Sequence, residues 1–201
     1  MPHASPRDKQ LLQDILVFLT LVAIGVAGRW GQPDWCFTPT AAVGIFAGFY
    51  FRHIGTALLV PLAVLGVTDL ALPSYDSRGV MLAVHVALAL PVVWGRALRS
   101  PSGPLATAAK LGLCGLAPAT LFFLISNWAV WQFQSDYAPT LSGLAACYAA
   151  AVPFYRAMLA GDIFYVTVLL GCYAASAAYL RRPVLQPATN LRSVPVRRTD
   201  S

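Results

Sequence analysis

Six long apolar blocks, separated by short polar connections, constrain the fold of this chain more than any other feature. Within each block the apolar residues run on continuously, without the period of an amphipathic helix or strand, and only 11% of the 201 residues are charged. A run of about 20 apolar residues can cross a bilayer as one helix. We therefore predict an all-α polytopic membrane bundle of six transmembrane helices. The blocks cover residues 11–28, 38–51, 54–72, 79–98, 105–131 and 141–180.

The last block is twice as long as one membrane span requires. As a single helix, residues 141–180 would extend about 60 Å, whereas the hydrocarbon core is about 30 Å thick. Pro153 and Gly161 both offer points at which a helix can end. We therefore predict a short interfacial or re-entrant helix at residues 141–152, followed by the sixth transmembrane helix at about residues 153–180.

The block at residues 38–51 is short and rich in small residues. These are Ala41, Ala42, Gly44, Ala47 and Gly48. Small side chains let membrane helices approach one another closely. We therefore predict that this helix lies inside the bundle.

Basic residues are divided unevenly between the two sides of the predicted bundle. With six spans and both termini cytoplasmic, only Arg29, Arg78 and Arg156 of the fourteen basic residues fall on the outer side. This asymmetry agrees with the positive-inside rule. Because the basic residues flank apolar blocks, the net charge of +6 does not indicate a nucleic-acid partner.

The chain is expected to contain one domain. We predict a cytoplasmic N-terminal segment at residues 1–10, an integral membrane domain at residues 11–182 and a disordered basic tail at residues 183–201. The lipid bilayer is therefore its first predicted partner.

Asp69, Asn127 and Asp162 are polar residues inside otherwise apolar blocks. Each lies about one helical turn from the same end of its span, so all three fall in the outer third of the predicted bundle. Such groups are costly in hydrocarbon and usually face a protein interior or a water-filled cavity. The other groups predicted at this depth are Thr38, Thr40 and Arg156. We predict a ligand pocket open to the outside, in which Arg156 pairs with Asp162 or with an anionic group of the ligand.

Aromatic residues near the outer ends of the blocks offer stacking surface for a ligand. Trp35, Trp128 and Trp131 are the predicted contributors. The same residues could instead form an interfacial aromatic belt. The polar residues have a structural alternative too, since carboxylates can cap or link helices and Asn127 can hydrogen bond across a helix interface.

Enzyme signatures are weak. The sequence contains no HExxH, GxSxG or P-loop motif, and its four cysteines show no CxxC spacing. We predict no metal and no cofactor, and an enzyme is not the favoured interpretation. His85, in the middle of its block, is either a core histidine with satisfied hydrogen bonds, or part of a proton relay or a ligand contact.

A longer pattern of residues runs through these positions. It includes WCFTPTAA at residues 35–42, AGFYF at 47–51, TDL at 68–70, LFFLISNWAVW at 121–131 and GD at 161–162. Over about residues 30–175 the chain resembles an uncharacterised bacterial family of six-span membrane proteins. That family is similar in size and span pattern to the S components of energy-coupling-factor (ECF) vitamin transporters. The resemblance implies a protein that captures a small molecule outside the cell and docks on an ATPase-driven partner.

The leading hypothesis is an uptake component for a vitamin-like molecule in the bacterial inner (plasma) membrane. Asp69, Asn127, Asp162 and Arg156 would orient the ligand, and a partner would supply the energy because the sequence has no nucleotide-binding motif. The alternatives are a membrane-embedded enzyme or proton-coupled carrier that uses Asp69 and Asp162, and a structural membrane subunit.

Overall fold

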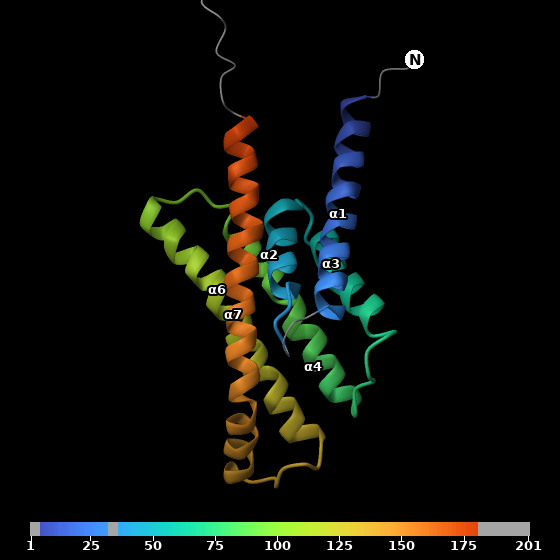
Figure 1. The fold of residues 1–201 in the computed structure, drawn as a ribbon, viewed down its shortest axis with the longest axis vertical. Coiled ribbons are helices and arrows are strands. Elements are labelled where there is room, and N and C mark those ends of the chain that lie inside the picture. Colours follow the sequence, from blue (N-terminus) through green and yellow to red (C-terminus); the bar gives the residue numbers. More distant parts are fainter. Residues whose placement is uncertain (1–4, 32–35, 181–201) are drawn as a thin grey trace, which may run out of the picture.

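The computed structural model describes residues 5–31 and 36–180. Trp35 and the predicted tail at residues 183–201 lie outside the described residues. The described part is helical and contains no strand, which confirms the predicted all-α class for this part of the chain (Figure 1). Its helices are α1 (Pro6–Trp30), α2 (Thr40–Tyr50), α3 (Ile54–Thr68), α4 (Arg78–Ala89), α5 (Pro91–Ala97), α6 (Pro104–Phe133) and α7 (Leu141–Leu180).

Four helical stretches are long and apolar enough to cross a membrane. They are α1, the consecutive helices α4 and α5 taken together, α6 and α7. The helices α2 and α3 are apolar but have only 11 and 15 residues. The block predicted at residues 79–98 is divided at Leu90, because Pro91 has no backbone N–H and begins a new helix.

The bundle has two ends that differ in character (Figure 1). The first turn of α1, the last turn of α7 and the connections at residues 51–53 and 98–103 lie at one end, which we call the basic end. The segments at residues 36–39 and 69–77 lie toward the other end, which we call the cavity end.

The helix α2 lies in the middle of the bundle, as its small residues predict. It contacts α1, α3, α4, α5, α6 and α7. Its buried residues are Thr40, Ala41, Ala42, Val43, Gly44, Ile45, Ala47 and Gly48. A helix buried on nearly all sides can be shorter than a bilayer is thick, because its neighbours and not lipid surround its ends.

Glycines set the distance between α2 and α5. A Cβ atom on Gly95 would overlap the carbonyl oxygen of Ile45, and one on Gly48 would overlap the carbonyl oxygen of Val92. Backbone therefore packs directly on backbone at this contact. Only glycine is compatible with such an approach.

Two arginines bind the backbone at the basic end. Arg99 donates from Nε to the carbonyl of Phe49 at 2.7 Å and from Nη2 to the carbonyl of Phe51. Arg96 donates from Nη1 to the carbonyl of Arg52 at 3.2 Å. The last carbonyls of a helix have no partner within the helix, so these side chains cap the end of α2 and its connection to α3.

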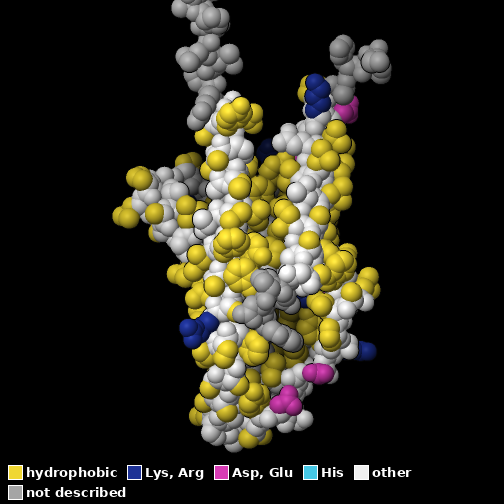
Figure 2. Space-filling model, in the orientation of Figure 1, with side chains coloured by type: hydrophobic (Ala, Val, Ile, Leu, Met, Phe, Trp, Pro, Cys, Tyr) yellow, Lys and Arg dark blue, Asp and Glu magenta, His cyan; other side chains and the backbone are white. Residues whose placement is uncertain are grey.

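Large apolar side chains cover the outside of the long helices (Figure 2). On α1 the exposed residues include Leu11, Leu12, Leu16 and Leu19, and on α6 they include Leu105, Leu113 and Leu116. A water-soluble domain seldom exposes so much apolar surface. This surface suits contact with lipid chains.

The predicted helix break near Pro153 is wrong. The helix α7 runs without interruption from Leu141 to Leu180, so residues 141–152 form no separate interfacial or re-entrant helix. The proline removes one backbone hydrogen bond, but α6 holds α7 on both sides of it. The Tyr148 hydroxyl donates to the carbonyl of Leu124 at 2.7 Å, and the hydroxyls of Thr120 and Tyr155 lie 3.1 Å apart. The extra length forms a hairpin with α6 that extends past the other helices (Figure 1).

Candidate functional site

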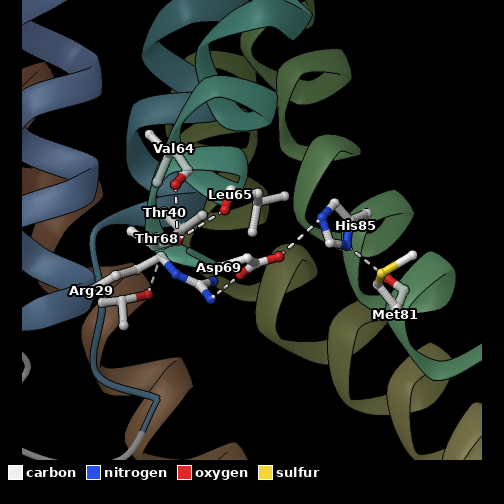
Figure 3. A network of polar contacts seen from close by, with 9 residues as sticks. Arg29, Thr40, Val64, Leu65, Thr68, Asp69, Met81 and His85 are labelled. Carbon is white, nitrogen blue, oxygen red and sulfur yellow. Dashed lines mark hydrogen bonds and ion pairs between the residues drawn. The ribbon is translucent and has the colours of Figure 1, made fainter. Parts of the chain in front are cut away.

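Asp69 lies between two basic side chains from different helices (Figure 3). Its Oδ1 atom is 3.5 Å from Nη2 of Arg29 on α1, and its Oδ2 atom is 3.2 Å from Nε2 of His85 on α4. His85 continues the series through Nδ1, which lies 2.8 Å from the carbonyl oxygen of Met81. Ionisable groups from α1, from the C-cap of α3 and from α4 therefore form one polar chain, Arg29–Asp69–His85, at the cavity end.

The local sequence explains why these groups meet. The helix α3 ends at Thr68, a buried residue whose hydroxyl donates to the carbonyl of Val64 at 2.8 Å. Asp69 follows as the C-cap residue, so its side chain leaves the helix at the edge of the packed core. Arg29 occupies the last turn of α1, where the negative end of the helix dipole favours a cation.

A cavity of about 380 Å³ lies beside the polar chain. Its lining residues are Arg29, Cys36, Thr38, Asp69, Leu72, Pro73, Tyr75, Val84, Leu88, Phe122 and Met158. Burial raises the pKa of the Tyr75 phenol, and the nearby Asp69 carboxylate raises it further. Tyr75 is therefore a neutral hydroxyl in this wall at neutral pH. We call this space the main cavity.

Asn127 and Asp162 line two smaller spaces next to the main cavity. The space beside Asn127 has a volume of about 110 Å³, and that beside Asp162 a volume of about 10 Å³. Phe122 of α6 and Met158 of α7 line all three spaces. Asp69, Asn127 and Asp162, which were predicted to share a depth, therefore lie around the same two apolar side chains, Phe122 and Met158. Each of the three polar residues lines a different space.

The two inner polar residues differ in their hydrogen bonding. Asn127 donates from Nδ2 to the carbonyl of Phe123 on its own helix at 2.7 Å. Asp162 is only 3% exposed, and within the described part of the chain its Oδ2 atom has no hydrogen-bond partner.

The segment at residues 36–39 forms part of the cavity wall and is held in place by α7. The ring of Phe37 packs on those of Phe164 and Tyr165, with centroids 6.0 and 5.4 Å away. A Cβ on Gly161 would lie 3.3 Å from the Cα of Phe37, so this glycine lets the segment approach α7 closely. Cys36 has a φ of 66°, a left-handed conformation that is uncommon outside glycine.

The two threonines of this region have different positions. Thr38 lines the main cavity and the space beside Asp162. Thr40 is buried at the start of α2, and its hydroxyl lies 3.1 Å from that of Thr38. Only Thr38 therefore reaches the main cavity.

A family model matches residues 9–185, which is most of the chain and includes every residue of the site. The chain belongs to the family of unknown function DUF6580. No curated protein and no solved structure matches it. The family therefore places this chain among related sequences without assigning an activity.

Some of the residues predicted for the site lie away from the main cavity in this DUF6580 member. Arg156 is exposed on α7 and forms no ion pair with Asp162. Trp128 and Trp131 line none of the spaces described above. Trp131 donates from its indole to the carbonyl of Ala138 at 3.0 Å and so fixes the connection between α6 and α7.

Several residues of the site were missing from the sequence prediction. Arg29 and Tyr75 line the main cavity, and Phe122 and Met158 divide the three spaces. A signal for Arg29 existed, because the predicted topology places it on the same outer side as Asp69 and opposite charges at one depth favour a contact. The two apolar residues gave no signal, since nothing distinguishes them from other members of their blocks.

Proposed function

We propose that this protein is a membrane-embedded component that binds a small molecule from the outside for uptake. The main cavity beside the Arg29–Asp69–His85 chain carries this proposal. Its apolar walls and few convergent polar groups are typical of small-molecule sites, and its volume of about 380 Å³ falls within their usual range.

The basic residues near the first turn of α1 and in the connections at residues 51–53 and 98–103 support a placement in which the basic end is cytoplasmic. When the cytoplasmic edge of the bilayer core lies at Leu180, the core takes up about 20 residues of α7, and its outer edge lies near Gly161. Arg156, which is exposed, then lies at the level of the outer headgroups. The main cavity lies near the same level because Met158 lines it. In this placement the chain passes six times through the membrane of a bacterial cell, and α2 and α3 are its two short passes.

Energy for uptake would come from a partner. The sequence has no nucleotide-binding motif, and its span pattern is similar to that of ECF S components, which dock on an ATPase-driven partner. That similarity is an analogy of architecture, and architecture alone does not fix function.

Native mass spectrometry of the full chain, extracted in mild detergent, tests the proposal. We expect a bound small molecule on the unaltered protein and its loss from the Asp69→Asn variant. Asp76→Asn is the matched control, because Asp76 is an exposed carboxylate that accepts a hydrogen bond from Gln134 at 3.1 Å outside the main cavity. A protein that carries no molecule in any form, together with an Asp69→Asn strain that shows no uptake defect, would rule the proposal out.

A proton-coupled carrier is a second candidate, and the 3.2 Å contact between Asp69 and His85 is the observation that favours it. Such a carrier needs no ATPase partner. Uptake into liposomes that contain only this protein, driven by an imposed pH gradient and lost on Asp69→Asn, would favour it over the uptake component.

A further inference from the structure

We infer that the main cavity takes a small organic monoanion, a carboxylate on an apolar body, which pairs with Arg29 and binds together with one proton held between Asp69 and His85. This inference rests on the proposed function, because it names the ligand class of the same cavity. Three features of the site carry it: the unmet donor of Arg29, the proton that the His85 geometry requires and the summed charge.

Arg29 is the polar group of the site with an unused donor. Within the described residues, its buried Nε atom has no hydrogen-bond partner, and its contact with Asp69 is long at 3.5 Å. Arginine has only donors, arranged in a planar fork that suits a carboxylate. Both oxygens of Asp69, by contrast, already have basic partners. Arg29 also hydrogen bonds the Tyr75 phenol, so the donor that stays unmet is the buried Nε atom, and a ligand carboxylate supplies its acceptor when the guanidinium turns toward the main cavity.

The geometry of His85 requires a proton between His85 and Asp69. A carbonyl oxygen can only accept, so the 2.8 Å contact with Met81 places a hydrogen on Nδ1. Nε2 then faces Oδ2 of Asp69 at 3.2 Å. Without a second proton, two lone pairs would face each other at this distance. One proton therefore lies between Nε2 of His85 and Oδ2 of Asp69, bonded to one of these two atoms.

The charges of the site favour one negative charge on the ligand. Asp69 and His85 with their shared proton are neutral as a pair, so Arg29 leaves a net charge of +1. A monoanion makes the site neutral, whereas loss of the shared proton would give the occupied site a net charge of −1. An uncompensated charge in a partly buried, apolar cavity is costly. Binding of the anion and retention of the proton therefore strengthen each other.

The other groups around the polar chain leave this balance unchanged at neutral pH. Tyr75, in the connection between α3 and α4, is a neutral phenol whose ring contacts that of His85 with centroids 5.9 Å apart. The walls from α6 and α7 are the apolar Phe122 and Met158, and the segment at residues 36–39 contributes Cys36 and Thr38. Arg78 of α4 lines a separate space that Asp69 also borders, and because its side chain is exposed, solvent and salt screen its charge.

The volume and the apolar lining of the main cavity fit a small ligand. The main cavity has a volume of about 380 Å³, and most of its lining residues are apolar. A carboxylate placed at Arg29 leaves the rest of the molecule against Leu88, Phe122 and Met158. Short aliphatic or single-ring carboxylates are therefore suitable probes.

The experiment measures thermal unfolding of the full chain in lipid nanodiscs with benzoate and hexanoate, and with the matched neutral amides benzamide and hexanamide. Titrations are run at about pH 6 and about pH 8, because the inference links binding of the anion to retention of the shared proton. We expect the carboxylates to raise the unfolding midpoint and the amides to leave it unchanged. We also expect the apparent Kd of the carboxylates to weaken by up to roughly tenfold for each pH unit through which the shared proton is lost. Amides that act as well as carboxylates, or carboxylates that bind more tightly at high pH, would overturn the inference.

Two variants separate the roles of the basic groups. Arg29→Gln should abolish the effect of the carboxylates. His85→Gln should bind them weakly at both pH values, because an amide can donate to Asp69 but does not bring the positive charge of the shared proton. Arg52→Gln is the matched control at the basic end, because its side chain is exposed and does not line the main cavity. Equal responses of Arg29→Gln and Arg52→Gln would overturn the inference.

The molecule that co-purifies with the unaltered protein gives an answer that does not depend on whether a variant folds. A monoanionic molecule supports the inference. A neutral, cationic or zwitterionic molecule overturns it and leaves the proposed function standing, whereas a protein that binds neither a natural molecule nor any probe overturns both.

Discussion

The two ends of the bundle use arginine in different ways. At the basic end, Arg96 and Arg99 donate to backbone carbonyls, and the glycine contact between α2 and α5 beside them packs backbone on backbone. At the cavity end, Arg29 faces a carboxylate across 3.5 Å, retains an unused donor and lines a cavity of about 380 Å³. The same residue type thus completes the fold at one end and leaves binding capacity at the other.

This difference helps to distinguish structural from functional polar groups. A buried polar group whose hydrogen bonds are all made within the protein contributes to stability, whereas one with an unmet donor beside a cavity has capacity for a ligand. Substitutions at the two ends should therefore separate stability from binding.

The largest effect is expected for Gly95→Ala. The added Cβ would overlap the carbonyl oxygen of Ile45, so α5 would have to move away from α2. We expect a loss of about 3 kcal/mol or more in the free energy of unfolding, or no folded protein. Thermal unfolding in detergent measures it, and a midpoint equal to that of the unaltered protein would show that the contact is not tight.

Arg99→Gln should cause the next largest loss of stability. It removes two hydrogen bonds from a charged donor to the end of α2 and its C-cap, which we expect to cost about 2–3 kcal/mol. The co-purifying ligand should still be present, because the main cavity lies at the other end. Loss of the ligand with little loss of stability would contradict the structural role of this arginine.

Arg29→Gln should give the reverse pattern. Asp69 keeps its contact with His85 and is 24% exposed, so we expect a cost of only about 1 kcal/mol in stability. Ligand binding should nevertheless be lost. The comparison of the two ends fails if this variant is destabilised as much as Arg99→Gln, which denaturant titration of both proteins would reveal.

The smallest effect, and of opposite sign, is expected for Gly112→Ala. A Cβ at this position on α6 would meet no atom within 4 Å. Alanine is a better helix former than glycine, so we expect stability to rise by about 0.5–1 kcal/mol. A destabilised Gly112→Ala protein would show that small residues are required throughout the bundle and not only at close contacts such as that of Gly95.

Much of the fold could be predicted from the sequence because it depends on local composition. The apolar blocks predicted helices, and the small residues of residues 38–51 predicted the inner position of α2. The polar residues Asp69, Asn127 and Asp162 were placed at one depth, and the structure finds them around Phe122 and Met158. The length of a block and the cost of a polar residue in hydrocarbon can both be judged from neighbouring residues alone.

The details that were missed depend on contacts between distant segments. Pro153 predicted a helix end, but α6 packs against α7 on both sides of it and keeps the helix continuous. The predicted pairing of Arg156 with Asp162 did not form, since Arg156 is exposed whereas Asp162 is buried.

By itself, the sequence determined that this chain is a bundle of apolar helices with costly polar groups at one level. The reason is that the burial of apolar residues and the free-energy cost of a charge in an apolar environment are properties of each segment. Only the tertiary structure decided which charges meet. Arg29, Asp69 and His85 come from α1, the C-cap of α3 and α4, and their contacts depend on how these three helices pack. The cavity beside them is the space which that packing leaves unfilled.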